Sequence, residues 1–312
     1  MIATSGACAT AVVPLAASAA ESDIVLRTPT GTIAGTLTLP GNAAGPVPVV
    51  LIIAGSGPTD RNGNSGPVQG NTYLLLAQAL ASRGIASVRY DKRGIAGSAA
   101  AITSESAIRF DTFIDDAAAW QHQLRGDARF SRIVVAGHSE GSLIGMVSVQ
   151  RGPADAYVSL EGAGRPAPVV LREQLHPKLP PDLYAQADAT LTQLQGGHAV
   201  ADPPPQLAML FRPSVQPYLI SWFAYDPATQ IAKVRLPTTI VQGTADVQVS
   251  MTDAHALASA QPAARLVVVD GMNHVLKHAP DESTQQAILA GYSDPSLPVA
   301  PQVVDAVTAA TR

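Results

Sequence analysis

Residues 133–141 read Ile-Val-Val-Ala-Gly-His-Ser-Glu-Gly, an apolar run that leads directly into a Gly-x-Ser-x-Gly motif. This motif is typical of a nucleophilic serine on a sharp turn between a strand and a helix. The backbone of such a turn is strained, and the residues two before and two after the serine crowd it unless they lack a Cβ. Gly137 and Gly141 provide that space. The motif therefore predicts Ser139 as a nucleophile, provided that an acid, a base and an oxyanion site occur elsewhere, because Gly- and Ser-rich turns also arise by chance.

The apolar runs on either side of this motif predict an α/β fold. The run over residues 47–54 is typical of a strand buried on both faces of a parallel sheet. Strands that alternate with helices imply right-handed crossovers, and an alternating pattern before them predicts an antiparallel hairpin. We expect a doubly wound, mostly parallel sheet. The expected strands cover residues 23–27, 32–39, 47–54, 85–90, 133–136, 156–160, 238–241 and 266–269, and the expected core helices cover residues 72–82, 110–124, 140–150 and 300–310.

The regular pattern breaks between the strand that ends at residue 160 and the one that begins at residue 238. About seventy residues rich in proline, with helical patches over 182–194 and 216–225, are too long for a plain connection. We expect residues 163–236 to form a helical cap on a core made of residues 21–162 and 237–312. The cap carries several aromatic side chains, which either line an acyl pocket or attach the cap to the core: Phe211, Tyr218, Trp222 and Phe223.

Two polar loops follow the last two expected strands, and they end in Asp246 and His274. The carboxyl ends of parallel strands meet at one edge of a sheet, where catalytic groups collect. With Ser139 these residues give the chain order Ser, Asp, His that this kind of fold uses. We predict that His274 takes the proton of Ser139 during attack and returns it to the leaving group. Asp246 is predicted to hold the imidazole in the required tautomer.

Other acids and bases compete for these roles. Asp270 directly ends a strand, and Glu161 ends the strand after the motif helix. His278 lies further into the same loop as His274, and His138 is expected to pack or bond structurally. A pair of Glu140 and Glu161 in glycosidase fashion has no supporting pattern. Asp246 and His274 therefore remain the predicted acid and base.

A tetrahedral intermediate also requires donors for its oxyanion. The backbone N–H of Glu140 directly follows the nucleophile and is the first predicted donor. The second is expected from the loop that leaves the strand over residues 47–54, and we assign it to the backbone N–H of Ser56. Pro58 in the same loop lacks an N–H.

With these motifs the chain resembles the α/β-hydrolase superfamily, and more narrowly its bacterial esterase and serine-aminopeptidase-like (S33-type) branch. The matching stretches are residues 54–63, 90–94, 137–141, 242–246 and 272–274. The resemblance implies hydrolysis of small-molecule carboxylic esters without a cofactor. Ala54 departs from it, because a histidine usually precedes the glycine of the oxyanion loop. Asp91 and Arg93 match a motif of the superfamily, and we interpret them as a structural charge pair that braces loops near the site.

Composition excludes several classes of partner and cofactor. The formal net charge of -4 comes without a long basic run, so neither nucleic acid nor an anionic membrane surface is expected. The single cysteine, Cys8, allows no disulfide within the chain and no thiolate metal cluster. We expect no cofactor and no metal. A dinucleotide-binding protein is disfavoured because Asp60 stands where the third glycine of the phosphate loop belongs.

Residues 7–20 form an apolar stretch that ends in small residues, with Ala17-Ser18-Ala19 as an Ala-x-Ala-like cleavage site. The stretch is too short for a membrane span, and residues 1–6 contain no Lys or Arg. We interpret residues 1–20 as a signal peptide with an atypical or incomplete start, which predicts a periplasmic or secreted protein. The alternative is an Ala-rich tail on a cytoplasmic protein.

The sequence thus predicts a serine carboxylesterase that acts on small to medium acyl groups through an acyl-enzyme intermediate. A thioesterase, peptidase or amidase would use the same residues. A non-catalytic binding protein on this fold remains a remote alternative, which the loss of a triad residue would favour.

Overall fold

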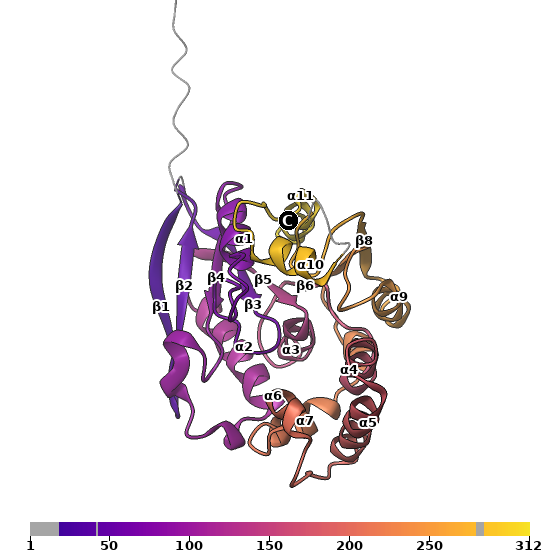
Figure 1. The fold of residues 1–312 in the computed structure, drawn as a ribbon. Helices are drawn as coiled ribbons and strands as arrows, with labels where there is room; N and C mark the ends of the chain where they lie inside the picture. Colours follow the sequence, from indigo (N-terminus) through magenta and orange to yellow (C-terminus); the bar gives the residue numbers. More distant parts are fainter. Residues whose placement is uncertain (1–18, 42, 279–283) are drawn as a thin grey trace, which may run out of the picture.

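The computed structural model describes residues 19–41, 43–278 and 284–312 (Figure 1). Within these residues eight strands form one sheet in the order β1-β2-β4-β3-β5-β6-β7-β8. β2 is antiparallel to β1 and to β4, and all other neighbours are parallel. The strands are β1 (Ala20–Thr28), β2 (Gly31–Leu39), β3 (Val47–Ile53), β4 (Ala86–Tyr90), β5 (Phe130–His138), β6 (Ala156–Leu160), β7 (Thr238–Gly243) and β8 (Arg265–Val269). The predicted α/β class with a mostly parallel sheet is confirmed.

The strand order reverses between β3 and β5. After β3 the chain forms β4 on one side, then crosses to form β5 on the other side and continues outward to β8. At such a switch point the loops after the two strands separate, and a crevice opens at their carboxyl ends. Ser56 follows β3 and Ser139 follows β5. The topology therefore brings these two residues to the place where ligands bind in doubly wound sheets.

Helices cover both faces of this sheet. Alternate residues of β3 point to opposite faces, because side chains alternate along a strand. Val50 and Ile52 pack in a cluster with α1 (Thr72–Ala81) and α11 (Pro301–Ala310). The intervening residues of β3 pack on the other face against three helices. Those helices are α2 (Phe110–Arg125), α3 (Glu140–Ser148) and α9 (Met251–Ala260). Burial of β3 on both faces explains its continuous apolar sequence.

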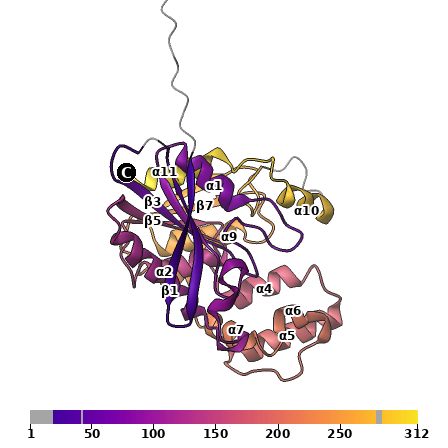
Figure 2. The ribbon, with the colours of Figure 1, turned by 90° about the vertical axis from the view of Figure 1, so that its left-hand side faces the viewer.

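The cap lies between β6 and β7 and forms a separate group of helices beside the carboxyl ends of the strands (Figure 2). It has its own small apolar core, to which Leu191, Phe211 and Leu219 contribute fully or nearly fully buried side chains. Its helices are α4 (Ala167–Leu175), α5 (Pro181–Gln195), α6 (Ala208–Phe211), α7 (Gln216–Phe223) and α8 (Pro227–Ile231). Prolines stand within the first turn of α4, α5, α7 and α8, where a missing N–H costs no hydrogen bond.

The helix predictions were incomplete. Five helices were not expected from the sequence, namely α4, α6, α8, α9 and α10 (Gln285–Ser293). Short 3-10 segments also occur at η1 (Ala96–Ala101), η2 (Glu105–Ala107) and η3 (Pro205–Leu207). α9 begins with a capping box of Ser250 and Asp253, a signal that the sequence contained. Helices α4 and α10 are anchored by long-range contacts, which local patterns do not reveal.

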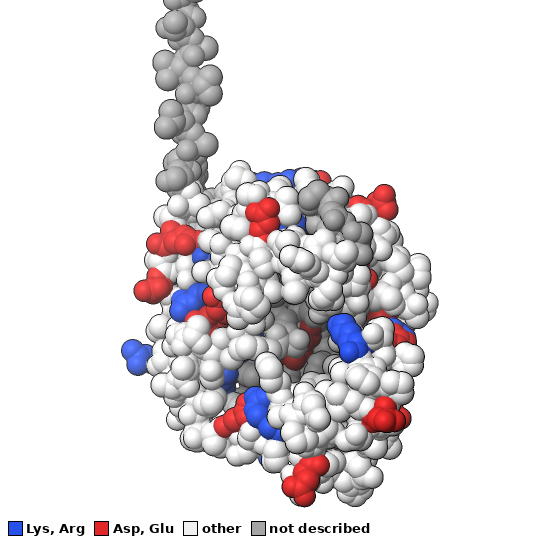
Figure 3. Space-filling view, in the orientation of Figure 1, with Lys and Arg blue, Asp and Glu red and all other residues white. Residues whose placement is uncertain are grey.

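The predicted signal peptide lies almost entirely outside the described residues, and the first strand begins at Ala20, directly after the predicted cleavage site. No helix in the described part of the chain has the length and apolar character needed to cross a bilayer. On the face seen in Figure 3, Lys, Arg, Asp and Glu are scattered over a mostly uncharged surface.

Candidate active site

Ser139 occupies a strained turn between β5 and α3. Its φ of 54° and ψ of -121° lie in a region that non-glycine residues rarely adopt. A Cβ at Gly137 would overlap the carbonyl oxygen of Gly141, and a Cβ at Gly141 would overlap that of Ile53. The two glycines therefore allow the turn to pack directly on the loop after β3. The backbone N–H of Ser139 donates to the carbonyl of Leu160 at 2.9 Å, which anchors the turn on β6.

Ser139, His274 and Asp246 form a hydrogen-bonded series. The distance from Ser139 Oγ to His274 Nε2 is 3.0 Å, and that from His274 Nδ1 to Asp246 Oδ2 is 2.7 Å. A carboxylate accepts, so Nδ1 carries the proton and Nε2 is free to accept from the serine hydroxyl. The arrangement is the one in which a histidine acts as a general base toward a serine.

Asp246 is buried and held by several donors. Its Oδ1 accepts the backbone N–H groups of Gln248 and Val249 at 2.7 and 3.0 Å. Burial by itself raises the pKa of Asp246, but His274 and the surrounding donors outweigh it and lower the pKa to about 2. The carboxylate is thus ionised at neutral pH. The competing residue Asp270 lies on the surface and bonds to Thr244, away from His274.

His138 links the loop that carries His274 to the loop after β3. Its Nε2 lies 2.7 Å from the carbonyl oxygen of His274, which can only accept, so Nε2 carries the proton. Burial and the nearby His274 lower the pKa of His138 to about 3, which keeps it neutral. Its Nδ1 therefore accepts the hydroxyl of Tyr73 at 2.8 Å, and the Tyr73 oxygen accepts the N–H of Gly55 at 3.0 Å. The expected structural role of His138 agrees with these contacts.

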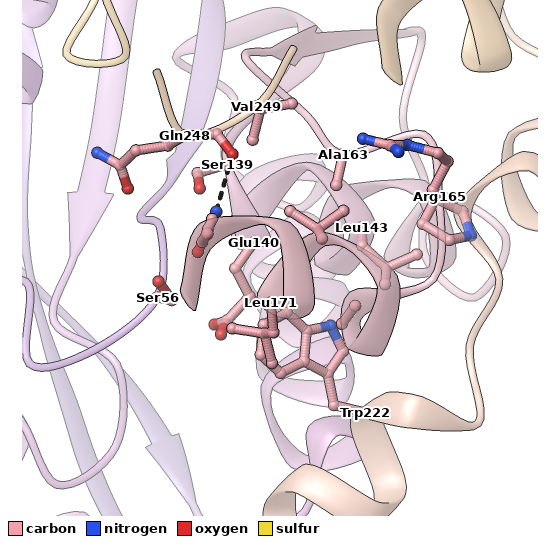
Figure 4. Close-up of a pocket in the computed structure, with 14 residues that line it drawn as sticks. Ser56, Ser139, Glu140, Leu143, Ala163, Arg165, Leu171, Trp222, Gln248 and Val249 are labelled. Atoms are coloured by element: carbon pink, nitrogen blue, oxygen red, sulfur yellow. Dashed lines mark hydrogen bonds between the residues drawn. The ribbon is translucent and has the colours of Figure 1, made fainter. Parts of the chain in front are cut away.

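The two predicted oxyanion donors border the same cavity as Ser139 (Figure 4). Glu140 is the first residue of α3, where a backbone N–H has no partner within the helix. Ser56 follows Gly55, and a Cβ added to Gly55 would lie 3.2 Å from the Cβ of Ser139. Within the described residues, neither the Ser56 N–H nor the Glu140 N–H donates to a protein acceptor. Both are free to bind an oxyanion.

The cavity has a volume of about 80 Å³ and lies between the cap and the carboxyl end of the sheet, where the surface in Figure 3 is hollowed. Its apolar lining includes Leu143 from α3, Val170 and Leu171 from α4, and Trp222 from α7. The Gln174 side-chain amide donates to the Gln248 carbonyl at 2.8 Å, so α4 is tied to the loop that carries Asp246 (Figure 4).

The four aromatic side chains of the cap lie in different surroundings. Trp222 lines the cavity, but Phe211 and Phe223 are buried in the apolar core of the cap. Tyr218 also lies off the cavity lining, and its hydroxyl donates to Glu140 Oε2 at 2.6 Å. Phe211 lies on a different helix, α6, and on α7 Tyr218 and Trp222 share one face but the Tyr218 hydroxyl is directed at Glu140.

The comparisons with known proteins agree with this architecture. A family model described as serine aminopeptidase, S33, matches residues 69–193. The esterase EstD of Thermotoga maritima is 28% identical over 255 residues, which make up 80% of this chain and 59% of that protein. The solved structure of Est1E from Butyrivibrio proteoclasticus superposes with a TM-score of 0.58 at 15% identity, over 92% of this chain and 99% of that one.

The chain has the α/β-hydrolase fold. A second solved structure, the esterase domain of a Rhodothermus marinus protein, aligns with a TM-score of 0.54 at 18% identity, over 88% of this chain and 95% of that domain. The predicted resemblance to the α/β-hydrolase superfamily and its esterase and serine-aminopeptidase-like branch is confirmed.

The contacts of Asp91 and Arg93 differ from the predicted charge pair. Asp91 does not pair with Arg93. Its carboxylate accepts from Arg61, at 3.0 Å from the side-chain Nε, and from the N–H of Gly97. Arg93 instead pairs with the buried Asp116 on α2, at 2.5 Å. The two charges therefore join different segments, Asp91 the loop after β3 and Arg93 helix α2.

Two buried groups of the site had no predicted role. Glu161 lies behind Asp246, and burial together with the charge of Asp246 raises its pKa well above the usual range. It is therefore a neutral acid beside the ionised Asp246, and its Oε1 accepts the N–H of Gly243 at 2.9 Å. Lys92 contacts both Gly55 and Glu140. Lys92 lies in the matching stretch 90–94, and Glu161 follows the strand that ends at residue 160. The sequence did not reveal their roles, because their partners are distant in the chain.

Among the described residues, no group of three or more His, Cys, Asp and Glu side chains could hold a metal ion.

Proposed function

We propose that the protein is a serine hydrolase that cleaves carboxylic esters through an acyl-enzyme intermediate. The proposal depends chiefly on one observation, the 3.0 Å contact of Ser139 Oγ with His274 Nε2, whose other nitrogen lies 2.7 Å from Asp246. The similarity to EstD, a protein named as an esterase, supports the ester as the substrate class.

In the first half of the proposed reaction, Ser139 Oγ attacks the carbonyl carbon of the ester, and its proton passes to His274 Nε2. The ionised Asp246 stabilises the imidazolium that forms. The carbonyl oxygen becomes an oxyanion between the N–H groups of Ser56 and Glu140. Collapse of this intermediate breaks the bond to the alcohol, which takes the proton from His274 as it leaves.

The second half repeats these steps with water. His274 removes a proton from a water molecule, whose oxygen attacks the acyl carbon, and the oxyanion site again holds the negative charge. Collapse releases the carboxylic acid, and His274 returns the proton to Ser139. The sequence of steps balances without a redox partner, a metal ion or an organic cofactor.

The cavity favours small to medium acyl groups. Its volume of about 80 Å³ is small, and Leu143, Leu171 and Trp222 present apolar surface to whatever enters it. We propose that this space holds the acyl chain.

The test combines covalent labelling with hydrolysis of nitrophenyl esters of increasing acyl length. The wild-type protein is expected to react with a fluorophosphonate at Ser139 and to hydrolyse the shorter esters best. Ser139→Ala is expected to lose both properties. A wild type that neither labels nor cleaves any ester, or an alanine variant that retains both, rejects the proposal.

Ser56→Ala is the matched control, because it removes a hydroxyl in the same cavity and leaves the backbone N–H in place. It is expected to stay within a few-fold of wild type. Parallel assays with a thioester and an anilide of the same acyl group measure the preference among leaving groups, since the same residues serve all three reactions.

We also propose that the protein is exported. The support is the apolar stretch over residues 7–20 and its Ala-x-Ala-like end. Expression of the full chain in a bacterial host, followed by N-terminal sequencing of periplasmic or secreted material, is expected to give a chain that begins near Ala20. Material that retains Met1 argues against cleavage.

A further inference from the structure

Lys92 is a buried cation beside the predicted oxyanion site. It follows β4, and its side chain is 3% exposed. Its Nζ donates to the carbonyl oxygen of Gly55 at 2.6 Å and to Glu140 Oε1 at 2.9 Å. The same ammonium lies 5.1 Å from the ring centroid of Phe113, which satisfies its remaining side by a cation–π contact. A single side chain therefore contacts the loop after β3 and the first residue of α3.

The contact with Gly55 orients the neighbouring peptide group. A trans peptide is planar, and its C=O and N–H point in opposite directions. The described residues contain no cis peptide bond. With the Gly55 carbonyl directed at Lys92, the N–H of Ser56 is directed away from Lys92. Ser56 lines the same cavity as Ser139. The N–H of Gly55 is fixed as well, because it donates to Tyr73.

The contact of Lys92 with Glu140 also links it to the residue that carries the other predicted donor, the backbone N–H of Glu140. The carboxylate of Glu140 is 2% exposed and accepts from Lys92 on one oxygen and from Tyr218 on the other. Since Glu140 is the first residue of α3, its side chain and its own backbone N–H belong to the same turn. Lys92 thereby connects the two peptide groups that carry the predicted oxyanion donors.

The ion pair of Lys92 and Glu140 adds little net charge near the oxyanion, but it holds the surrounding groups in fixed positions. Lys92 and Glu140 neutralise one another, so the oxyanion gains little from either charge at a distance. Buried ion pairs are weak contributors to stability, because the cost of removing both ions from water offsets their attraction. Burial of this ion pair next to the site is therefore better explained by a role in positioning other groups than by a role in stability alone.

We propose that Lys92 is a positioning residue, which sets the spacing and direction of the Ser56 and Glu140 N–H groups through its bonds to the Gly55 carbonyl and the Glu140 carboxylate. The inference rests on the proposed function. Its signature is a loss of transition-state stabilisation with little change in substrate binding, because the oxyanion exists only after attack.

The test uses three variants. Lys92→Met with Glu140→Gln removes both buried charges together, so no uncompensated ion remains in the core. Glu140→Gln alone keeps the bond from Lys92 to the Gly55 carbonyl. Arg93→Met with Asp116→Asn is the matched control, because it removes a second buried ion pair from the same loop that does not contact the oxyanion loop. Active sites are counted by fluorophosphonate titration, so that unfolded material does not reduce the apparent rate.

In the Lys92 and Glu140 double variant, kcat is expected to fall about 10- to 100-fold with KM within about threefold of wild type. The inhibition constant of a trifluoromethyl ketone, which forms a tetrahedral oxyanion on the serine, is expected to rise by the same factor as kcat/KM falls. Glu140→Gln is expected to lose less than the double variant in both measurements. The Arg93 and Asp116 variant is expected to keep kcat and the inhibition constant unchanged.

A double variant that equals Glu140→Gln in both kcat and the inhibition constant overturns the inference, and so does a loss that appears only in KM. Either result requires an active wild type. It therefore differs from failure of the proposed function, in which wild type itself neither labels nor hydrolyses esters.

Discussion

The core and the cap of this protein are built by different means. Around the site, the core buries ionisable side chains and satisfies them with specific partners, such as Lys92 with Glu140 and Asp246 with His274. The cap is a set of short helices around a small apolar cluster, and most of its ion pairs lie on the surface. Buried polar networks fix one geometry, whereas apolar contacts tolerate repacking. The comparison favours a division in which the core positions the groups of the proposed reaction, and the cap determines the size of the acyl group that enters the cavity.

Helix α7 makes several of the contacts between the two regions. Trp222 stacks on Phe110 of α2 with ring centroids 5.9 Å apart, and Tyr218 donates to Glu140. The hydroxyl of Ser221 accepts the N–H of Phe110 at 2.8 Å. These contacts position the apolar wall of the cavity over the nucleophile. Changes in the core are therefore expected to alter rate, and changes in the cap are expected to alter selectivity and cap attachment.

The largest effect is expected from the acid in the core. Asp246→Asn reverses the hydrogen bond to His274 Nδ1 and favours the wrong tautomer, so kcat is expected to fall about 10³- to 10⁴-fold. Steady-state hydrolysis of a short nitrophenyl ester measures kcat for this variant and for wild type. Asp270→Asn makes the same chemical change at an exposed strand end and is expected to retain activity. Equal losses in the two variants would mean that the acid has been assigned wrongly.

Glu161→Gln is expected to stabilise the core at neutral pH. Burial and the charge of Asp246 raise the pKa of Glu161 above its value of 4.5 in the unfolded chain. The folded state then keeps a proton that the unfolded state releases, so wild-type stability falls as pH rises from 4.5 to the folded pKa. The slope is about 1.4 kcal/mol per pH unit. Glutamine has no such proton, and its side-chain oxygen can still accept the N–H of Gly243.

The measurement is the free energy of unfolding in urea for both proteins at pH 5 and pH 7. The advantage of Glu161→Gln is expected to grow from pH 5 to pH 7, by at most about 1.4 kcal/mol per pH unit. A difference that stays constant, or that shrinks as pH rises, contradicts a neutral Glu161 in the folded protein.

Tyr218→Phe removes one bond between the cap and the core. The hydroxyl donates to a buried carboxylate at 2.6 Å, and hydrogen bonds to charged groups contribute about 1.5 to 3 kcal/mol. A loss of that size in unfolding free energy is expected. Tyr225→Phe is the control, because its hydroxyl bonds to the more exposed Asp111 at 2.7 Å and is expected to cost less. A larger loss of unfolding free energy in Tyr225→Phe than in Tyr218→Phe would contradict this role of Tyr218 in attaching the cap.

The smallest effect is expected from Leu171→Ala, which enlarges the cavity from the side of the cap. The ratio of kcat/KM for a hexanoate ester to that for an acetate ester is expected to rise about tenfold, in line with the few kcal/mol available from apolar pocket contacts. Leu175→Ala on the same helix packs in the cap cluster and does not line the cavity. It is expected to leave the ratio unchanged, and an equal shift would show that cap stability, not cavity volume, controls selectivity.

Much of the core was predictable because its signals are local. β3 reads as a continuous apolar run because both of its faces are covered, and the turn at Ser139 requires glycine on both sides because backbone atoms approach closely there. The loops that carry Asp246 and His274 follow apolar strands, so their place at one edge of the sheet follows from parallel topology. The cap was less predictable, since which side of α7 faces the cavity depends on where the helix docks.

By itself the sequence determined the α/β class, the order Ser139, Asp246, His274 along the chain and the presence of an inserted cap, because these depend on hydrophobic period, glycine positions and strand ends. Only the tertiary structure decided the partners of the buried charges, including Lys92 with Gly55 and Glu140, and the choice of Trp222 over Phe211 for the cavity. The physical reason is the distance along the chain over which each effect acts. Backbone propensity acts over a few residues, whereas the pairing of buried polar groups is settled only when segments far apart in the chain have lost their water together.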